Sequence, residues 1–159
     1  MINWLQKKCT EMVQQERSSH RLAISFCVGV YIAFSPFIGL HTVITFFVAW
    51  LFGLNIVALL GSRLLINNPW TMVPLYSAGN FFGNNFCMYL FGTTMFEQNP
   101  SWMSWINEPL TQYVGVSGIS FWSFFIGTNL LGIAIGVILY PVMRYVFTRL
   151  IIAHHGSYN

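Results

Sequence analysis

Long apolar stretches alternate with short polar clusters along most of the chain. The stretches over 22–66 and 121–139 hold few ionisable groups, and they lack the apolar-polar alternation that marks half-buried strands. Such runs are typical of membrane helices, and the missing alternation argues against an outer-membrane barrel. We therefore expect an all-α fold, a small polytopic helical membrane protein with two broken or re-entrant helical elements.

The first broken element is predicted over 22–54. Its opening apolar run, Leu22–Phe34, is about thirteen residues, or roughly 20 Å of helix, which is too short for the ~30 Å hydrocarbon core of a bilayer. A second apolar run, Val43–Leu54, follows soon after, so the pair predicts either a re-entrant hairpin or a strongly broken helix. The residues expected to break it are Ser35, Pro36 and Gly39.

The second broken element is predicted over 56–92. Asn67 and Asn68 interrupt a short apolar run before a longer one resumes. Asn68 followed by Pro69 has the form of an N-cap with proline at the first helical position, so a new half-helix is expected to start there. Pro69 and Pro74 are the prolines assigned to this break.

The two elements also resemble each other weakly. Gly29 precedes Pro36, and Gly61 precedes Pro69, by similar distances along the chain. Chance matches are common in apolar sequence, although internal repeats are frequent in transporters. The likeness suggests an internal repeat.

Charged and interfacial residues predict where the ends and the middle of the chain lie. Lysines and arginines flank the apolar part on both sides, whereas 93–118 carries glutamates and aromatic residues but no lysine or arginine. The positive-inside rule puts both termini in the cytoplasm and 93–118 outside. A solvated helix is the alternative to a membrane-surface helix at the N-terminus. The predicted segments are a cytoplasmic amphipathic helix over 1–20, a membrane domain over 21–147 that ends in a membrane helix over 119–147, and a cytoplasmic tail over 148–159.

The last apolar run carries small residues at a spacing that favours close packing. Gly132 and Gly136 form a G-x-x-x-G pair, which lets two helices approach closely. The pair is expected either to pack against helices of the same chain or to join two copies of the chain in a homodimer.

Composition strengthens the membrane interpretation. The 159 residues are 55% hydrophobic and 7% charged, whereas a soluble domain carries about 25% charged residues. So few charges cannot cover a water-facing surface, and we expect lipid to solvate the chain. The net charge of +3 comes from flanking residues, which favours membrane orientation over nucleic-acid binding. We expect several membrane crossings.

Arg63 is the only charged residue between Arg21 and Glu97. A lone arginine in an apolar run costs several kcal/mol unless it meets water or a partner, which favours a functional role. If Arg63 lies close to a membrane face, its long stem instead lets the guanidinium snorkel to the headgroups without any ligand. The sequence leaves both interpretations open.

The two breaks supply the candidate ligand-binding residues. Irregular backbone at membrane depth is costly unless it is buried in protein or lines a wet cavity, and half-helix N-termini attract anions. Thr42 is predicted to cap a helix that begins at Val43, and Thr71 falls in the first turn after Asn68. His41 can donate to an anion, relay a proton or cap backbone carbonyls. The predicted site consists of Arg63, Asn67, Asn68, Thr71, His41 and Thr42.

Catalytic chemistry is not expected. The four acidic residues lie outside the apolar stretches, so none is placed to pair there with a histidine or a second acid. His154 and His155 lack a carboxylate or thiol partner, and the three cysteines are scattered. We therefore expect no enzyme activity, no metal and no cofactor.

Two short motifs carry a resemblance to a known family. One is P-x-x-G-x-H-T, from Pro36 to Thr42, and the other is N-P-x-T-x-x-P-x-Y, from Asn68 to Tyr76. Over 21–92 the chain resembles the bacterial membrane-protein family called domain of unknown function 2062. The resemblance implies a multi-pass protein of the bacterial inner (cytoplasmic) membrane, without an established activity. Because that domain is sometimes joined to glycosyltransferase-like modules, the resemblance also implies a link to lipid-linked sugars or the envelope.

Two functions fit these residues. The first is binding or translocation of an anionic amphiphile or solute at two facing broken helices, within the lipid bilayer. The alternative is a non-catalytic interaction or scaffold subunit, in which the breaks allow compact packing and the last helix contacts a partner such as an envelope enzyme. Access of water distinguishes the two, because a ligand site is wet and a packing break is dry.

Overall fold

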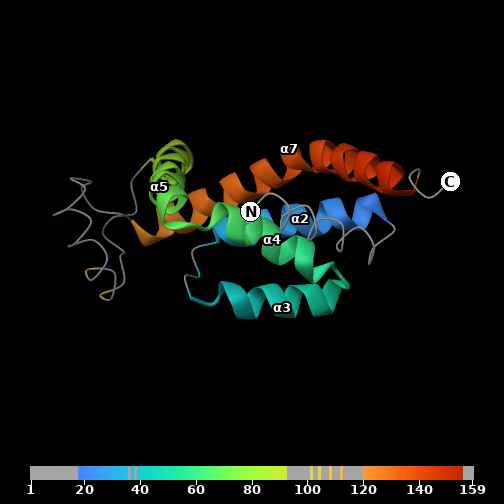
Figure 1. Ribbon diagram of the computed structural model, residues 1–159. Coiled ribbons are helices and arrows are strands. Elements are labelled where there is room, and N and C mark those ends of the chain that lie inside the picture. The colour runs from blue at the N-terminus through green and yellow to red at the C-terminus, as the bar shows by residue number, and fades with distance from the viewer. Residues whose placement is uncertain are drawn as a thin grey trace. The chain divides into compact units, whose positions relative to one another are not determined.

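The computed structural model describes residues 18–35, 37, 39–92, 101, 104, 108, 112 and 120–155. Five helices are described in full, and no strand occurs within these residues: α2 (Ser19–Phe34), α3 (His41–Phe52), α4 (Ile56–Ile66), α5 (Pro69–Phe91) and α7 (Phe121–His155) (Figure 1). The all-helical prediction is confirmed. Residues 1–17 of the predicted N-terminal helix, Pro36, most of the segment 93–118 and the last four residues of the predicted tail lie outside the described residues. Ser19 and His20, which fall within that predicted helix, belong to α2.

The helices belong to two compact units, and α7 contributes to both. The first unit is built from α2, α3, α4 and the part of α7 from Ile133 onward, and the second from α5 and the part of α7 up to Gly132. Leu22 of α2 is fully buried in one hydrophobic cluster of the first unit, and Phe124 of α7 is buried in the second unit. Each unit therefore has a small hydrophobic core of its own.

In the first unit, α3 and α4 form a helical hairpin (Figure 1). α3 ends at Gly53, whose φ of 58° lies in the left-handed region that glycine adopts without strain. Asn55 then starts α4, because its side-chain oxygen accepts hydrogen bonds from the backbone N–H groups of Val57 and Ala58 at 3.1 and 3.0 Å. The hairpin brings the start of α3 beside the end of α4.

α2 packs tightly against α4 in the same unit. Gly29 permits this approach, because a Cβ atom there would overlap the backbone of Leu59 and the hydroxyl of Ser62. Ser25 ties the two helices together: its hydroxyl accepts a hydrogen bond of 2.8 Å from the backbone N–H of Asn55 and donates one of 2.7 Å to the carbonyl of Arg21. A buried polar link and a glycine contact thus hold α4 on α2.

Three of the helices are short. α2, α3 and α4 have 16, 12 and 11 residues, which makes them about 24, 18 and 17 Å long. None reaches the ~30 Å thickness of a hydrocarbon core. The breaks between helices fall at 35–40 and at 67–68, where the sequence placed its interruptions.

α7 is the one helix in the described part of the chain that is long and apolar enough to cross a membrane, over Phe121–Ala153. The prediction ended the last helix at residue 147 and started a tail at 148, whereas α7 continues to His155. Thr148 and Arg149 are polar, but neither breaks a helix, and the next glycine after the apolar run is Gly156. The predicted boundary was placed by polarity alone, at residues that do not end a helix.

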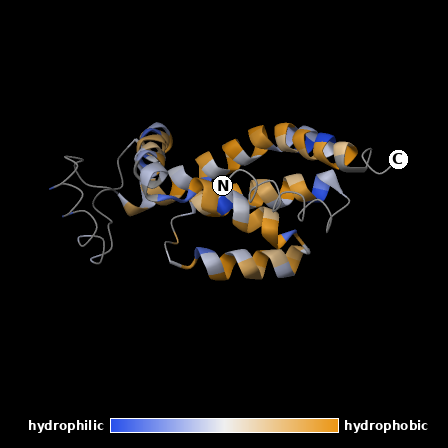
Figure 2. Ribbon diagram, viewed as in Figure 1, coloured by the Kyte–Doolittle hydropathy of each residue, from blue (hydrophilic) through white to orange (hydrophobic). Residues whose placement is uncertain are grey.

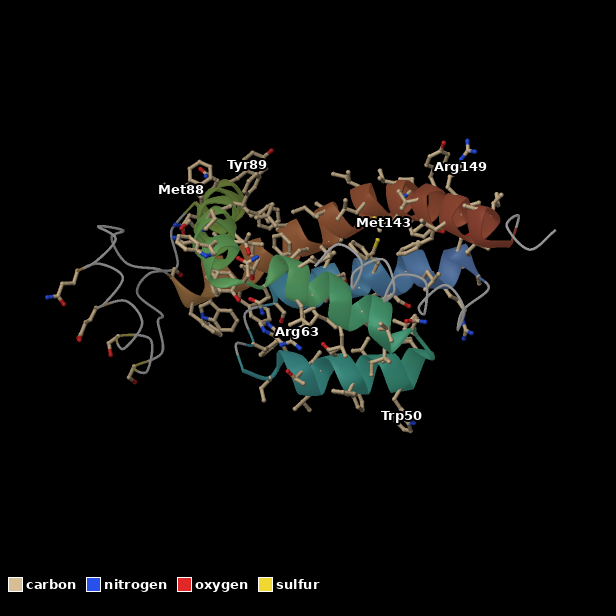
Figure 3. All side chains as sticks on the ribbon, in the orientation of Figure 1. Trp50, Arg63, Met88, Tyr89, Met143 and Arg149 are labelled. Atoms are coloured by element: carbon tan, nitrogen blue, oxygen red, sulfur yellow. The ribbon has the colours of Figure 1, made fainter. Side chains whose placement is uncertain are left out.

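Apolar side chains cover much of the outer surface. Exposed large hydrophobic side chains outnumber buried hydrophobic ones among the described residues, and only 17% of the most apolar part of α7 is buried. Figure 2 shows apolar residues along the outward sides of α3 and α7. Trp50 of α3 is 78% exposed and points away from α4 (Figure 3). This surface favours contact with membrane lipid, since the core helices of soluble proteins are mostly buried.

Two details of the predicted breaks are wrong. Thr42 does not cap a helix that begins at Val43: α3 begins at His41, its N-cap is Leu40, and no side chain caps it. Pro74 does not break a helix either, because it lies inside α5. A proline near the start of a helix removes a single backbone hydrogen bond, which membrane helices tolerate.

Candidate functional site

The α3–α4 hairpin brings four of the predicted residues together in the first unit. His41 and Thr42 open α3, while Arg63 lies in the last turn of α4 and Asn67 is the residue that ends it. Arg63 and Asn67 are four residues apart and so lie on one face of α4. Figure 3 shows Arg63 at the end of the hairpin where α3 begins. We call this group of four residues the Arg63 site.

Two side-chain hydrogen bonds connect the helices at the Arg63 site. Arg63 Nη1 donates to Thr42 Oγ1 at 3.1 Å. Asn67 Nδ2 lies 3.3 Å from His41 Nδ1, and because an amide nitrogen only donates, the imidazole nitrogen accepts. His41 is itself held in place, since it is 2% exposed and its carbonyl accepts a 2.6 Å hydrogen bond from the Thr45 hydroxyl. The site is therefore a fixed polar cluster between two apolar helices.

Two polar atoms of the Arg63 site make no hydrogen bond within the described residues. Arg63 Nε, a donor, and Asn67 Oδ1, an acceptor, are both buried and have no hydrogen-bond partner among the described residues. Buried polar atoms in native proteins usually have a partner, whether protein, water or ligand. The Arg63 site thus offers a spare donor and a spare acceptor one helical turn apart on α4.

The site carries one positive charge. Arg63 makes its hydrogen bond to Thr42 and no ion pair within the described part of the chain. A single cation without an anion beside it favours an anionic ligand over a cationic or metal ligand.

Asn68 and Thr71, the other two predicted residues, belong to the second unit. Asn68 is the N-cap of α5, and its side-chain oxygen accepts from the backbone N–H groups of Trp70 and Thr71, both at 3.1 Å. The Thr71 hydroxyl accepts in turn from the backbone N–H of Asn68 at 3.4 Å, which completes a capping box. The predicted helix start at Pro69 is confirmed. The backbone N–H groups at the start of α5 are therefore bonded to the cap itself and are not directed toward a ligand.

A family model for uncharacterised proteins conserved in bacteria (DUF2062) matches residues 2–155. The chain belongs to this family. The match confirms the resemblance drawn from the two motifs and extends well beyond 21–92 on both sides. No curated protein and no solved structure matches this DUF2062 chain.

The two motifs of the DUF2062 chain serve different purposes. The P-x-x-G-x-H-T motif forms the turn before α3, with Gly39 at a φ of 91°, and delivers His41 and Thr42 to the Arg63 site. Ser35, the first residue of this break, is buried. The N-P-x-T-x-x-P-x-Y motif starts α5 and ends at Tyr76, whose ring packs edge-on against Phe124 with the ring centroids 5.2 Å apart.

Sequence reasoning about the DUF2062 chain missed its closest helix contact. In the second unit, Gly79 and Gly83 of α5 lie directly against Gly127 of α7, and a Cβ atom at Gly83 or Gly127 would overlap the backbone of the other helix. The pair of glycines four residues apart on α5 was the available signal. Of the predicted packing residues, Gly132 is buried, and an added Cβ at Gly136 would make an ordinary 3.6 Å contact with the Cys27 carbonyl of α2.

Proposed function

We propose that this DUF2062 protein is an inner-membrane protein that binds an anionic amphiphile at the Arg63 site, without catalysis. The observation that supports this most strongly is the buried Arg63 Nε, which has no hydrogen-bond partner within the described residues, in a guanidinium that makes no ion pair there either. A charged side chain in the middle of a membrane costs about 2.5–3.5 kcal/mol even by the lowest scale, and a bound anion would offset that cost. Binding is the proposed activity, and transport would require movement of the same ligand.

The position of Arg63 along the hairpin argues against snorkelling. Arg21 Nη2 lies close to Gly53, within 3.3 Å of where a Cβ atom would be, so the hairpin turn is level with the start of α2. Arg63 follows Asn55 by eight residues, which is about 12 Å along α4. If Arg21 marks the cytoplasmic surface, as the positive-inside rule proposes, Arg63 lies near the middle of the ~30 Å core. That depth exceeds the length of an extended arginine side chain.

The spare atoms also specify the ligand's chemistry. An anionic oxygen would accept from Arg63 Nε, while a hydroxyl or amine on the ligand would donate to Asn67 Oδ1. A phospholipid with a hydroxylated headgroup carries both groups side by side. We therefore propose an anionic phosphodiester lipid with an adjacent hydrogen-bond donor as the ligand class.

Native mass spectrometry of the purified protein with added lipid tests the charge requirement. Wild type should bind phosphatidylglycerol in preference to phosphatidylcholine. Arg63→Gln should weaken phosphatidylglycerol binding by roughly 10- to 100-fold, since a charge-assisted hydrogen bond contributes about 1.5–3 kcal/mol. Arg149→Gln is the matched control, because Arg149 is exposed on α7 and this substitution removes the same charge at a place away from the site. Equal loss of binding in both variants would refute a site at Arg63.

A second lipid comparison tests the donor requirement. Phosphatidylmethanol carries the same charge as phosphatidylglycerol but has no headgroup hydroxyl. Wild type should bind phosphatidylglycerol more tightly, and Asn67→Ala should abolish that difference while it leaves the preference for anionic lipid in place. If wild type binds both anionic lipids equally, the pairing of donor and acceptor is wrong, although the charge requirement can still hold.

The rival proposal is a non-catalytic interaction subunit, which joins an envelope enzyme or a second copy of the chain. The caps support it, because Asn55 and Asn68 satisfy the backbone donors at the starts of α4 and α5 without any ligand. Cysteines placed at His41, Asn67, Asn68 and Thr71 in a cysteine-free background distinguish the proposals. Labelling by impermeant thiol reagents from one side favours a wet ligand site, and it also tests whether the two breaks face each other. Uniform protection favours the interaction subunit.

A further inference from the structure

α5 carries a row of polar side chains with buried oxygen atoms that the Arg63 site does not use. Tyr76, Asn80 and Asn84 are spaced four residues apart, so each is turned by only about 40° from the one before and all three share one strip of the helix. Tyr76 Oη, Asn80 Oδ1 and Asn84 Oδ1 are buried and have no hydrogen-bond partner among the described residues. Ser123 Oγ of α7 is likewise buried and has no hydrogen-bond partner among these residues. We call these four residues the Asn80 row.

The row belongs to the contact between α5 and α7 in the second unit. Tyr76 packs on Phe124, and Gly83, the neighbour of Asn84, lies against the carbonyl of Ser123. Asn80 is 8% exposed and Ser123 is fully buried. Because glycine brings the helices together on one side of the strip, the polar atoms beside it are enclosed and do not face the surroundings.

Four unpaired polar atoms in one helix contact are unusual, because buried polar groups in native proteins nearly always have partners. Enclosed groups that lack a protein partner are commonly satisfied by ordered water, which makes two to four hydrogen bonds of its own. All four atoms can accept hydrogen bonds, and the hydroxyls of Tyr76 and Ser123 can also donate, so the complementary occupant is one that donates to the two asparagine oxygens and can also accept.

The described helices around the row favour a neutral occupant. Neither α5 nor the part of α7 in the second unit contains a lysine, arginine, aspartate or glutamate. A small neutral molecule with two hydrogens to donate fits this set of oxygens, and water is the smallest such molecule. The Asn80 row therefore differs in chemistry from the Arg63 site, which holds a cation.

We propose that the Asn80 row is a hydrated site, in which a file of ordered water molecules bridges Tyr76, Asn80, Asn84 and Ser123. From Tyr76 to Asn84 the row extends about 12 Å along α5. α5 has 23 residues and is about 34 Å long, so the file would extend along roughly a third of the helix. The second unit thus provides a polar, uncharged strip along α5.

Water-edited NMR on protein with ¹⁵N-labelled asparagine side chains tests the proposal without a mutation. Magnetisation from water should reach the Asn80 and Asn84 amides as fast as it reaches Asn85, whose side chain is exposed on the same helix and donates to the Phe81 carbonyl. Transfer to Asn80 several-fold slower than to Asn85 would show a dry contact and overturn the proposal.

A substitution gives an independent result with opposite signs. Asn80→Leu keeps the size of the side chain but removes the hydrogen bonds to water, so the melting temperature should fall by several degrees. If the contact is dry, the same change removes an unpaired polar group and the melting temperature should rise. Asn85→Leu on the exposed side is the control and should not lower the melting temperature. A rise for Asn80→Leu would overturn the proposal.

Discussion

Gly29 and Gly61 make a matched test of the contact between α2 and α4. Both are helical glycines of the first unit, yet a Cβ atom at Gly29 would overlap the backbone of Leu59, whereas a Cβ atom at Gly61 would meet nothing within 4 Å. Alanine should therefore have opposite effects at the two positions. In Gly61→Ala, the helix gains about 1 kcal/mol, because alanine costs less conformational entropy than glycine.

The cost at Gly29 follows from the same geometry. Ser62 can turn its hydroxyl aside, but the Leu59 carbonyl is backbone, so α2 and α4 must move apart. Overpacking of this kind costs about 1–3 kcal/mol, against which the helix gains the same ~1 kcal/mol as at Gly61. The two variants should differ by about 2 kcal/mol, or roughly 4–8 °C in melting temperature for a chain of this size.

The buried thiols of Cys27 and Cys87 provide the assay. A thiol-reactive fluorescent dye labels them only when the protein unfolds, so a temperature ramp in detergent reports the melting temperature once Cys9 is replaced by serine. Circular dichroism confirms that both variants keep their helices at low temperature. Equal melting temperatures for Gly29→Ala and Gly61→Ala would refute the close contact between α2 and α4.

The remaining predictions use the same thiol assay. Asn55→Ala should lower stability by about 1–2 kcal/mol through loss of the α4 cap, whereas Asn85→Ala should change it by less than about 0.5 kcal/mol; similar effects would contradict the cap. Ser25→Ala should cost about 1–3 kcal/mol, because the buried N–H of Asn55 loses its acceptor, and an unchanged melting temperature would show that water replaces the hydroxyl. Gly83→Ala should cost about 1–3 kcal/mol through overlap with the Ser123 carbonyl, and a more stable variant would rule out that contact.

Helix ends could be predicted from sequence where the signal is local. Asn68 before Pro69 marks the start of α5 because the cap and the fixed proline dihedral act within one turn. Thr42 misled the prediction, since a threonine near a helix start caps it only when the backbone places the hydroxyl outside the first turn. In the structure Thr42 lies inside α3, where its hydroxyl is available to Arg63.

The helices that pack against each glycine could not be predicted, because glycines with the same spacing in the sequence have different neighbours in the structure. Gly29 and Gly61 occupy similar places in the suggested repeat, yet only the first touches another helix. Gly132 and Gly136 have the same spacing as Gly79 and Gly83, yet a Cβ atom at Gly136 would make only an ordinary contact, whereas one at Gly83 would overlap the backbone of α7. Periodicity gives the face of a helix, whereas the helix that covers this face depends on the path of the whole chain.

The contacts of the first unit also determine the order in which its helices can pack during synthesis. The unit's first described helix, α2, packs against residues far later in the chain: His20 Nδ1 lies 2.6 Å from the hydroxyl of Tyr140, 120 residues on, and the rings of Phe26 and Phe147 pack edge-on. Contacts between residues so distant in sequence form late, because the intervening chain must first be made and closed into a loop. α2, α3 and α4 therefore complete their core only after the part of α7 from Ile133 onward has been made, and a chain truncated before α7 would leave a completed hairpin with one side of its core still open.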